Sequence, residues 1–72
     1  MTQSERILLH LREVGPITWA QAASEYGIAH LASRISELRA AGYPITSRPV
    51  KSKNRYGEIV HFSEYRLEDM NA

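Results

Sequence analysis

The sequence has no cysteine, a single tryptophan and a single aspartate among its 72 residues. Without cysteine, neither a disulfide nor a thiolate-bound metal can stabilise the fold, so its stability must come from side-chain packing. No hydrophobic run approaches the roughly 20 residues of a transmembrane helix. The N-terminal segment lacks the charged, apolar and small-residue regions of a signal peptide. We therefore expect a cytoplasmic protein without membrane contact.

Motifs for catalysis are also missing. The only aspartate, Asp69, stands in a polar tail at 68–72 that we expect to fray, and no glycine-rich phosphate loop or nucleophile motif occurs. The histidines His10, His30 and His61 are too scattered for a zinc site. A chain of this size also has little room for a deep pocket. We expect no enzyme activity, no metal, no cofactor and no small-molecule ligand.

Hydrophobic residues make up 43% of the chain, which is enough for one small folded domain. We expect a single domain over residues 1–72, with a core over about 3–67. The formal net charge is only +1, but five basic residues and no acidic residue occur between Leu38 and Gly57. One face of the molecule should therefore be basic although the whole molecule is not.

The first predicted helix begins at Gln3, because Thr2 and Glu5 have the spacing of a capping box. It ends near Val14, where a glycine and a proline follow. A brief extended segment at 17–18 should then lead into a second helix.

The second predicted helix extends from Trp19 to about Tyr26, where a glycine permits a tight turn. The indole shares a face with small alanines, so we expect it to pack in the core or at its rim. A third helix, from about His30 to before Gly42, should bury Leu31, Ile35 and Leu38. Its opposite face should present His30, Ser33, Ser36, Glu37 and Ala40, with Arg34 and Arg39 on its two flanks.

A two-stranded hairpin is predicted beyond the third helix. The segments Ile45 to Lys51 and Glu58 to Leu67 are rich in β-branched and aromatic residues, and 54–57 is a turn signal. Pro49 predicts that the first strand lies at a sheet edge or is locally irregular, because proline cannot donate to the ladder. The apolar alternation changes phase near Ser63, so we expect a bulge or bend there.

The order of helix, short strand, helix, turn, helix and hairpin resembles the winged helix-turn-helix superfamily over Gln3 to Leu67. The fold class is then α+β, with three helices and a C-terminal β-hairpin wing. The compact three-helix version is disfavoured, because its pattern would place Ser33 and Ser36 at buried positions. Several segments look like the small helix-turn-helix proteins of phages and prophages: Ala22-Ala23, Tyr26-Gly27-Ile28, Leu31 to Leu38, Gly42-Tyr43-Pro44-Ile45 and Glu64-Tyr65-Arg66-Leu67.

This resemblance implies double-stranded DNA as the partner, with the third helix in the major groove. Arg34 could bind guanine, Glu37 could accept from a cytosine amino group, and His30 or Ser33 could reach a base edge or a phosphate. The wing and its flanks would contact the phosphate backbone or the minor groove. The candidate residues there are Arg39, Arg48, Lys51, Lys53, Asn54, Arg55 and Tyr56.

The function that fits this pattern is a bacterial phage or prophage transcription regulator, or an excisionase-like architectural factor in recombination. A single small domain makes few contacts, so binding should need a homodimer, adjacent copies or a protein partner, with the first helix as the candidate surface for self-association. The alternative is a winged-helix adaptor that binds protein, such as an inhibitor of a host complex. The low net charge and Glu37 on the presented face favour this alternative.

Overall fold

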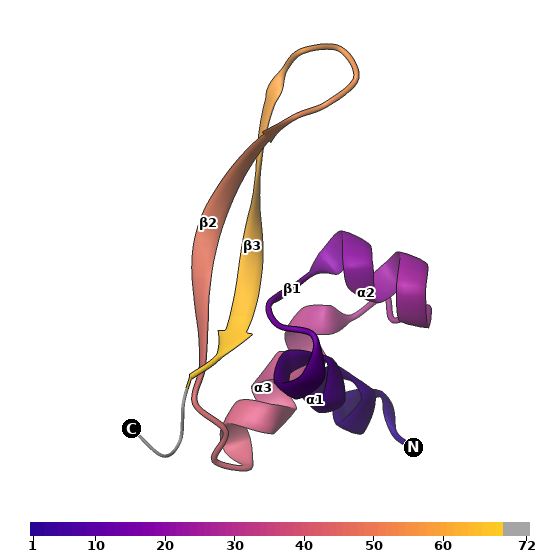
Figure 1. The fold of residues 1–72 in the computed structure, drawn as a ribbon, viewed down its shortest axis with the longest axis vertical. Coiled ribbons are helices and arrows are strands. Elements are labelled where there is room, and N and C mark those ends of the chain that lie inside the picture. Colours follow the sequence, from indigo (N-terminus) through magenta and orange to yellow (C-terminus); the bar gives the residue numbers. More distant parts are fainter. Residues whose placement is uncertain (69–72) are drawn as a thin grey trace.

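The computed structural model describes residues 1–68, so the predicted polar tail lies almost wholly outside the described residues. Three helices and three antiparallel strands follow one another in the predicted order, which confirms the α+β class (Figure 1). The sheet has the strand order β1-β3-β2, so β2 is an edge strand as Pro49 predicted. The elements are α1 Gln3–Glu13, β1 Ile17–Thr18, α2 Trp19–Tyr26, α3 Leu31–Ala40, β2 Ile45–Lys53 and β3 Ile59–Leu67.

Side-chain caps fix where the first two helices begin. The Thr2 hydroxyl accepts from the backbone N–H of Glu5 at 3.1 Å, and the Glu5 carboxylate accepts from the backbone N–H of Thr2 at 3.0 Å. Thr18 and Gln21 make the same reciprocal pair at the start of α2. Gly27, at φ 66°, ends α2 in the left-handed conformation that glycine adopts without strain.

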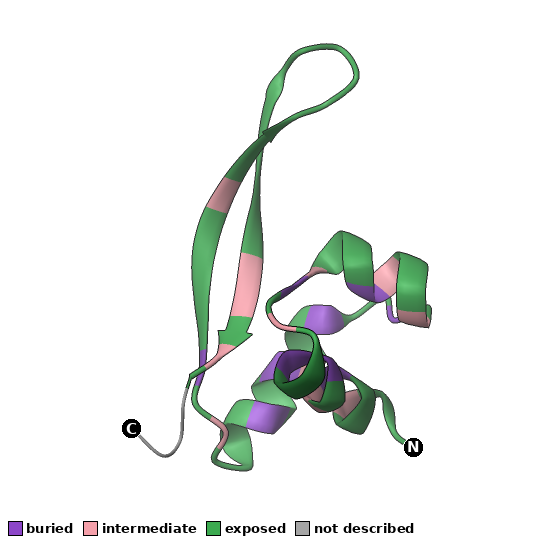
Figure 2. Ribbon diagram, in the orientation of Figure 1, coloured by how far each residue is buried: buried purple, intermediate pink, exposed green. Residues whose placement is uncertain are grey.

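The core lies where the three helices meet the base of the hairpin (Figure 2). It includes all three residues predicted for the buried face of α3. The sequence did not predict that His10 would be buried in α1, where it is 2% exposed. Its Nδ1 lies 2.6 Å from the Tyr26 hydroxyl oxygen and its Nε2 lies 3.3 Å from the Pro16 carbonyl oxygen, so both ring nitrogens have partners.

The hairpin has no bulge, so of the two alternatives predicted near Ser63, a bulge or a bend, the bulge is wrong. Its register is continuous from the pair Ile45 and Leu67 to the pair Lys53 and Ile59. The change of apolar phase has another cause, which is that the two faces of the hairpin have different surroundings. Its lower part packs on the helices, whereas its upper part extends beyond them (Figures 1 and 2).

No helix in residues 1–68 is both long enough and apolar enough to cross a bilayer. The molecule measures 40 × 28 × 20 Å, and the projecting hairpin accounts for its long axis (Figure 1). The first turn of α3 lies nearer the hairpin loop than its last turn does. The fold therefore places the amino-terminal end of α3 and the hairpin loop toward the same end of the molecule.

Candidate nucleic-acid interface

The face of α3 that points away from the core carries short side chains. Leu31, Ile35 and Leu38 are buried, whereas Ser33 and Ser36 are exposed, as the helical spacing predicted. The other exposed residues on this side are Ala32, Glu37 and Ala40, and His30 is exposed at the N-cap position. Small side chains let a helix backbone approach a partner closely, so this face fits a groove better than it fits a flat surface.

Arg34 and Glu37 lie on the flank of α3 that meets α1. A nitrogen of the Arg34 guanidinium is 2.9 Å from Glu37 Oε1, and the other carboxylate oxygen accepts from the Ser4 hydroxyl at 2.5 Å. The Arg34 Nε is buried without a hydrogen-bond partner among residues 1–68. The Arg34 side chain is 29% exposed and that of Glu37 is 52% exposed, so the pair is only partly open to water. The buried Nε offsets part of what the pair contributes, because a buried donor without a partner costs free energy.

Arg39 lies on the opposite flank of α3, where it contacts the base of the hairpin. Its Nε donates to the Ile45 carbonyl at 2.9 Å, and its guanidinium lies 6.0 Å from the centre of the Tyr65 ring. Arg39 therefore fixes the orientation of the hairpin relative to α3. The sequence pattern placed it correctly on a flank but did not predict this internal contact.

The hairpin has two faces with different chemistry. We call the inner face the one whose lower residues, Ile45, Tyr65 and Leu67, pack on the helices. Because cross-strand partners and residues two apart share a face, the strand register assigns every other position. The inner face continues toward the loop with Ser47, Pro49, Lys51, Lys53, Ile59, His61 and Ser63. The outer face carries Thr46, Arg48, Val50, Ser52, Val60, Phe62, Glu64 and Arg66.

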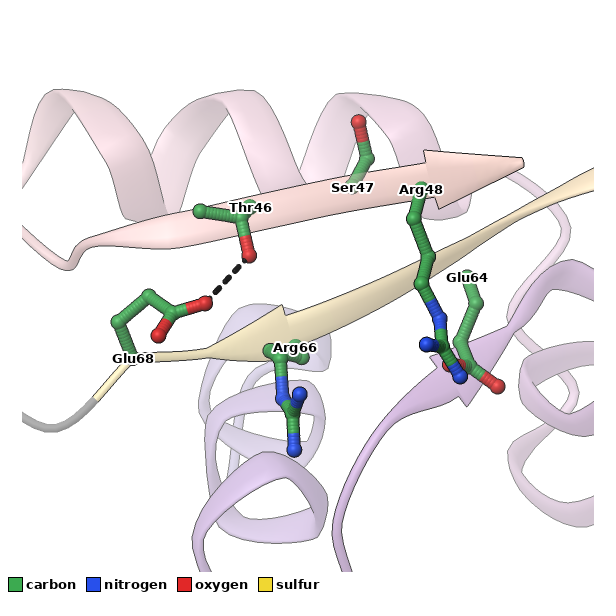
Figure 3. A pocket seen from close by; sticks show the side chains of 6 residues that line it. All are labelled: Thr46, Ser47, Arg48, Glu64, Arg66 and Glu68. Carbon is green, nitrogen blue, oxygen red and sulfur yellow. Dashed lines mark hydrogen bonds and ion pairs between the residues drawn. The ribbon is translucent and has the colours of Figure 1, made fainter. Parts of the chain in front are cut away.

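This division separates the predicted cationic residues of the wing. Lys51 and Lys53 lie on the inner face, together with the unpredicted residues Ile59 and His61. Arg48 lies on the outer face, where its Nε is 3.0 Å from Glu64 Oε1. Figure 3 shows the Arg48, Glu64 and Arg66 side chains on one side of the strands and Ser47 on the other. The alternation of residues between the two faces can be followed in the sequence. The bulge that we predicted near Ser63 would have interrupted it, so the sequence analysis did not assign the faces.

In the loop at the tip of the hairpin, one polar residue stabilises the turn and others are exposed to solvent. The Asn54 side-chain oxygen accepts from the backbone N–H groups of Tyr56 and Glu58, at 2.9 and 3.1 Å. Gly57, at φ 77°, completes the turn. Asn54 therefore holds the loop in shape, whereas Arg55 and Tyr56 are exposed at its end, Tyr56 to 79%.

Trp19 is not packed in the core or at its rim, so that prediction is wrong. The residue is 58% exposed, and its indole N–H donates to the Ala29 carbonyl at 2.9 Å. Ala29 precedes α3, so the ring lies over the turn between α2 and α3. Of the residues on the predicted buried face of α2, Ala22 is buried and Ala23 and Tyr26 are partly buried, whereas Trp19 is exposed.

Among residues 1–68, no three histidine, aspartate or glutamate side chains lie close enough together to hold a metal ion. The chain matches no curated protein and no solved structure. A family model described as a winged helix-turn-helix domain matches residues 2–69. A match of this kind points to DNA binding and fits the resemblance seen in the sequence.

Proposed function

Since the chain belongs to the winged helix-turn-helix family, we propose that it binds double-stranded DNA with α3 in the major groove and the inner face of the hairpin along the phosphate backbone. The support that carries most weight is the pairing of two features. The outward face of α3 carries short side chains at most positions, with His30 and Glu37 as the longer ones, and the hairpin beside it carries Lys51 and Lys53 on the strand face whose lower residues pack on the helices. Such a pairing suits a groove flanked by anionic strands.

The proposed contacts differ in kind. Lys51, Lys53 and Arg55 neutralise phosphates and position the domain without reading sequence. His30 and Ser33, at the start of α3, reach base edges or phosphates. Arg34 leaves its ion pair with Glu37 to reach a guanine, and the move exposes its buried Nε to a partner. Glu37 is then free to accept from a cytosine amino group.

We place this activity in the bacterial cytoplasm, in phage or prophage gene regulation or in the architecture of a recombination complex. The likeness of the central segment to phage helix-turn-helix proteins supports that setting. The short side chains on α3 offer few hydrogen bonds to bases, which fits a domain that works beside another copy or another protein.

The test is a fluorescence-anisotropy titration of a random-sequence duplex at about 50 and 200 mM salt. Three phosphate contacts give a slope of about −2.7 in log affinity against log salt, hence about a 40-fold weakening over this range. Absence of binding at the lower salt concentration would overturn the proposal. The protein-binding adaptor would then be the better interpretation, because a packed protein interface changes little with salt.

A further inference from the structure

The outer face of the hairpin carries apolar side chains that residues 1–68 leave partly exposed. Val60 and Phe62 are each 38% exposed, and Val50, the cross-strand partner of Phe62, is partly buried. Ile59 is more exposed, at 61%, but belongs to the inner face. A row of apolar side chains on the side away from the lysines does not suit phosphate contact.

Charged residues of both signs flank this row toward the base of the hairpin. Arg48 pairs with Glu64 across the strands, and Arg66, Thr46 and Glu68 continue the polar region around a shallow pocket of about 190 Å³ (Figure 3). Arg48 and Glu64 lie at the same height on neighbouring strands. A surface with this arrangement can face a second copy of itself across a two-fold axis so that opposite charges meet.

We propose that the outer face of the hairpin binds the outer face of a second copy of this chain, about a two-fold axis parallel to the strands. Such an axis places β2 of one copy opposite β3 of the other. Each residue keeps its position along the strand direction. Arg48 then faces Glu64 of the second copy, and Val50 faces its Phe62. Both charged residues meet a partner of opposite sign, and the apolar row becomes buried.

This arrangement leaves the two proposed DNA-binding surfaces free. The hairpins lie back to back and their loops point the same way, while the two inner faces and the two α3 helices point outward on opposite sides. The surface differs from that expected from the sequence, where the first helix was the candidate for self-association. The outer face is favoured because its charges match under the symmetry as well as its apolar residues.

The contact should be weak in free solution. Nine-residue strands at about 3.3 Å per residue and a ribbon about 10 Å wide offer about 300 Å² per copy, whereas a stable interface takes about 800 Å². We therefore expect a monomer at micromolar concentration and a monomer–dimer equilibrium at about 0.1–1 mM.

Sedimentation equilibrium of the free protein up to about 1 mM tests the proposal without DNA, so its outcome is independent of the DNA-binding proposal. Phe62→Ser should weaken dimerisation about tenfold or more, while the matched variant Ile59→Ser, on the inner face, should leave it unchanged. Thermal melting of both variants controls for folding. A protein that stays monomeric at 1 mM, or equal weakening by the two variants, would overturn the proposal.

Charge exchange provides a second test that does not remove apolar surface. Arg48→Glu alone should abolish dimerisation, because it places like charges opposite each other across the interface. The double variant Arg48→Glu with Glu64→Arg should restore it, because both the internal and the intermolecular pairs return. If the double variant dimerises no better than the single one, the proposed axis is wrong.

A short bismaleimide gives a third test, made simple by the absence of native cysteine. Packed sheets lie about 10 Å apart, too far for a disulfide but within reach of such a reagent. A mixture of Val50→Cys and Phe62→Cys proteins should cross-link more than a mixture of Val50→Cys and Ile59→Cys. Equal yields from the two mixtures would contradict the facing of Val50 with Phe62.

Discussion

Arg34 on α3 makes a contact that the helical spacing of the sequence did not predict. It is held by one ion pair with Glu37, and its Nε has no partner among residues 1–68. Helical spacing placed both residues correctly outside the buried stripe of the helix. Spacing alone could not show that α1 would lie close enough for Ser4 to bind Glu37, because that contact joins residues 33 positions apart.

We predict that Arg34→Ala changes the sequence preference of DNA binding. Removal of a guanine contact should alter discrimination at one base pair by about 1–3 kcal/mol, while binding to random duplex changes less. Selection from a random DNA pool, performed with both proteins, measures the effect. Recovery of the same motif from both selections would show that Arg34 does not read a base.

Glu5 gives a prediction for pH dependence. The backbone N–H of Thr2, and then its hydroxyl, hydrogen-bond with the Glu5 carboxylate and hold the pKa of Glu5 below its usual value. A lowered folded-state pKa contributes stability that is present above the unfolded-state value and is lost as pH falls through the folded-state value. The cap at the start of α1 should therefore weaken below about pH 4.5.

The variant Glu5→Gln should melt at nearly the same temperature near neutral pH, because glutamine serves in the equivalent cap of α2. Its melting temperature should fall less steeply between about pH 5 and pH 3 than that of the unaltered protein. Glu13→Gln, at the other end of α1, is the control and should keep the steep fall. Parallel curves for all three proteins would contradict a role for the cap.

At the level of secondary structure, the sequence predicted the elements well because their boundaries depend on local signals. Capping boxes, glycines at positive φ and the turn at 54–57 each act within a few residues. The hairpin faces were predicted less well. A change of apolar phase near Ser63 can arise from a bulge or from a change in what each face contacts, and only the position of the helices decides between them.

The two faces of the hairpin lead to a prediction for DNA binding. Lys51→Ala combined with Lys53→Ala should reduce the salt slope by about 1.8, which is about 0.9 for each phosphate that the variant no longer neutralises. Arg48→Ala should leave the slope unchanged, since Arg48 lies on the outer face and pairs with Glu64. Anisotropy titrations over a salt series measure both slopes. A slope that responds equally to the double variant and to Arg48→Ala would mean that both faces of the hairpin contact DNA.

For the molecule as a whole, the small size of the core limits stability. Within residues 1–68, the largest fully buried side chains come from four segments of the chain: Ile7, Ile17, Ile28, Leu31 and Ile35. We predict that Ile35→Ala costs about 2–5 kcal/mol, a large part of the 5–15 kcal/mol typical of a domain. Urea denaturation measures this, with Ile59→Ala as the exposed control, expected to change stability by less than about 0.5 kcal/mol. Similar destabilisation of both variants would contradict the described core.

The apolar pattern of the sequence predicted the buried residues of α3, since they repeat at regular helical spacing. It did not predict His10, because no local signal separates a buried histidine from an exposed one. Its partners, Tyr26 and Pro16, come together only when α1 and α2 pack. The relation of the helices to the hairpin was likewise inaccessible, because it depends on long-range contacts such as that between Arg39 and Ile45.

The place of Trp19 has a practical consequence. It is the sole indole of the chain, and it is fixed by its N–H to the carbonyl of Ala29, directly before the helix proposed to enter the groove. The tryptophan fluorescence of the protein therefore comes from one known place, at the amino-terminal end of α3. Binding of a ligand near this end of α3 should change the wavelength or the intensity of Trp19 fluorescence, so it can be measured on the unlabelled protein.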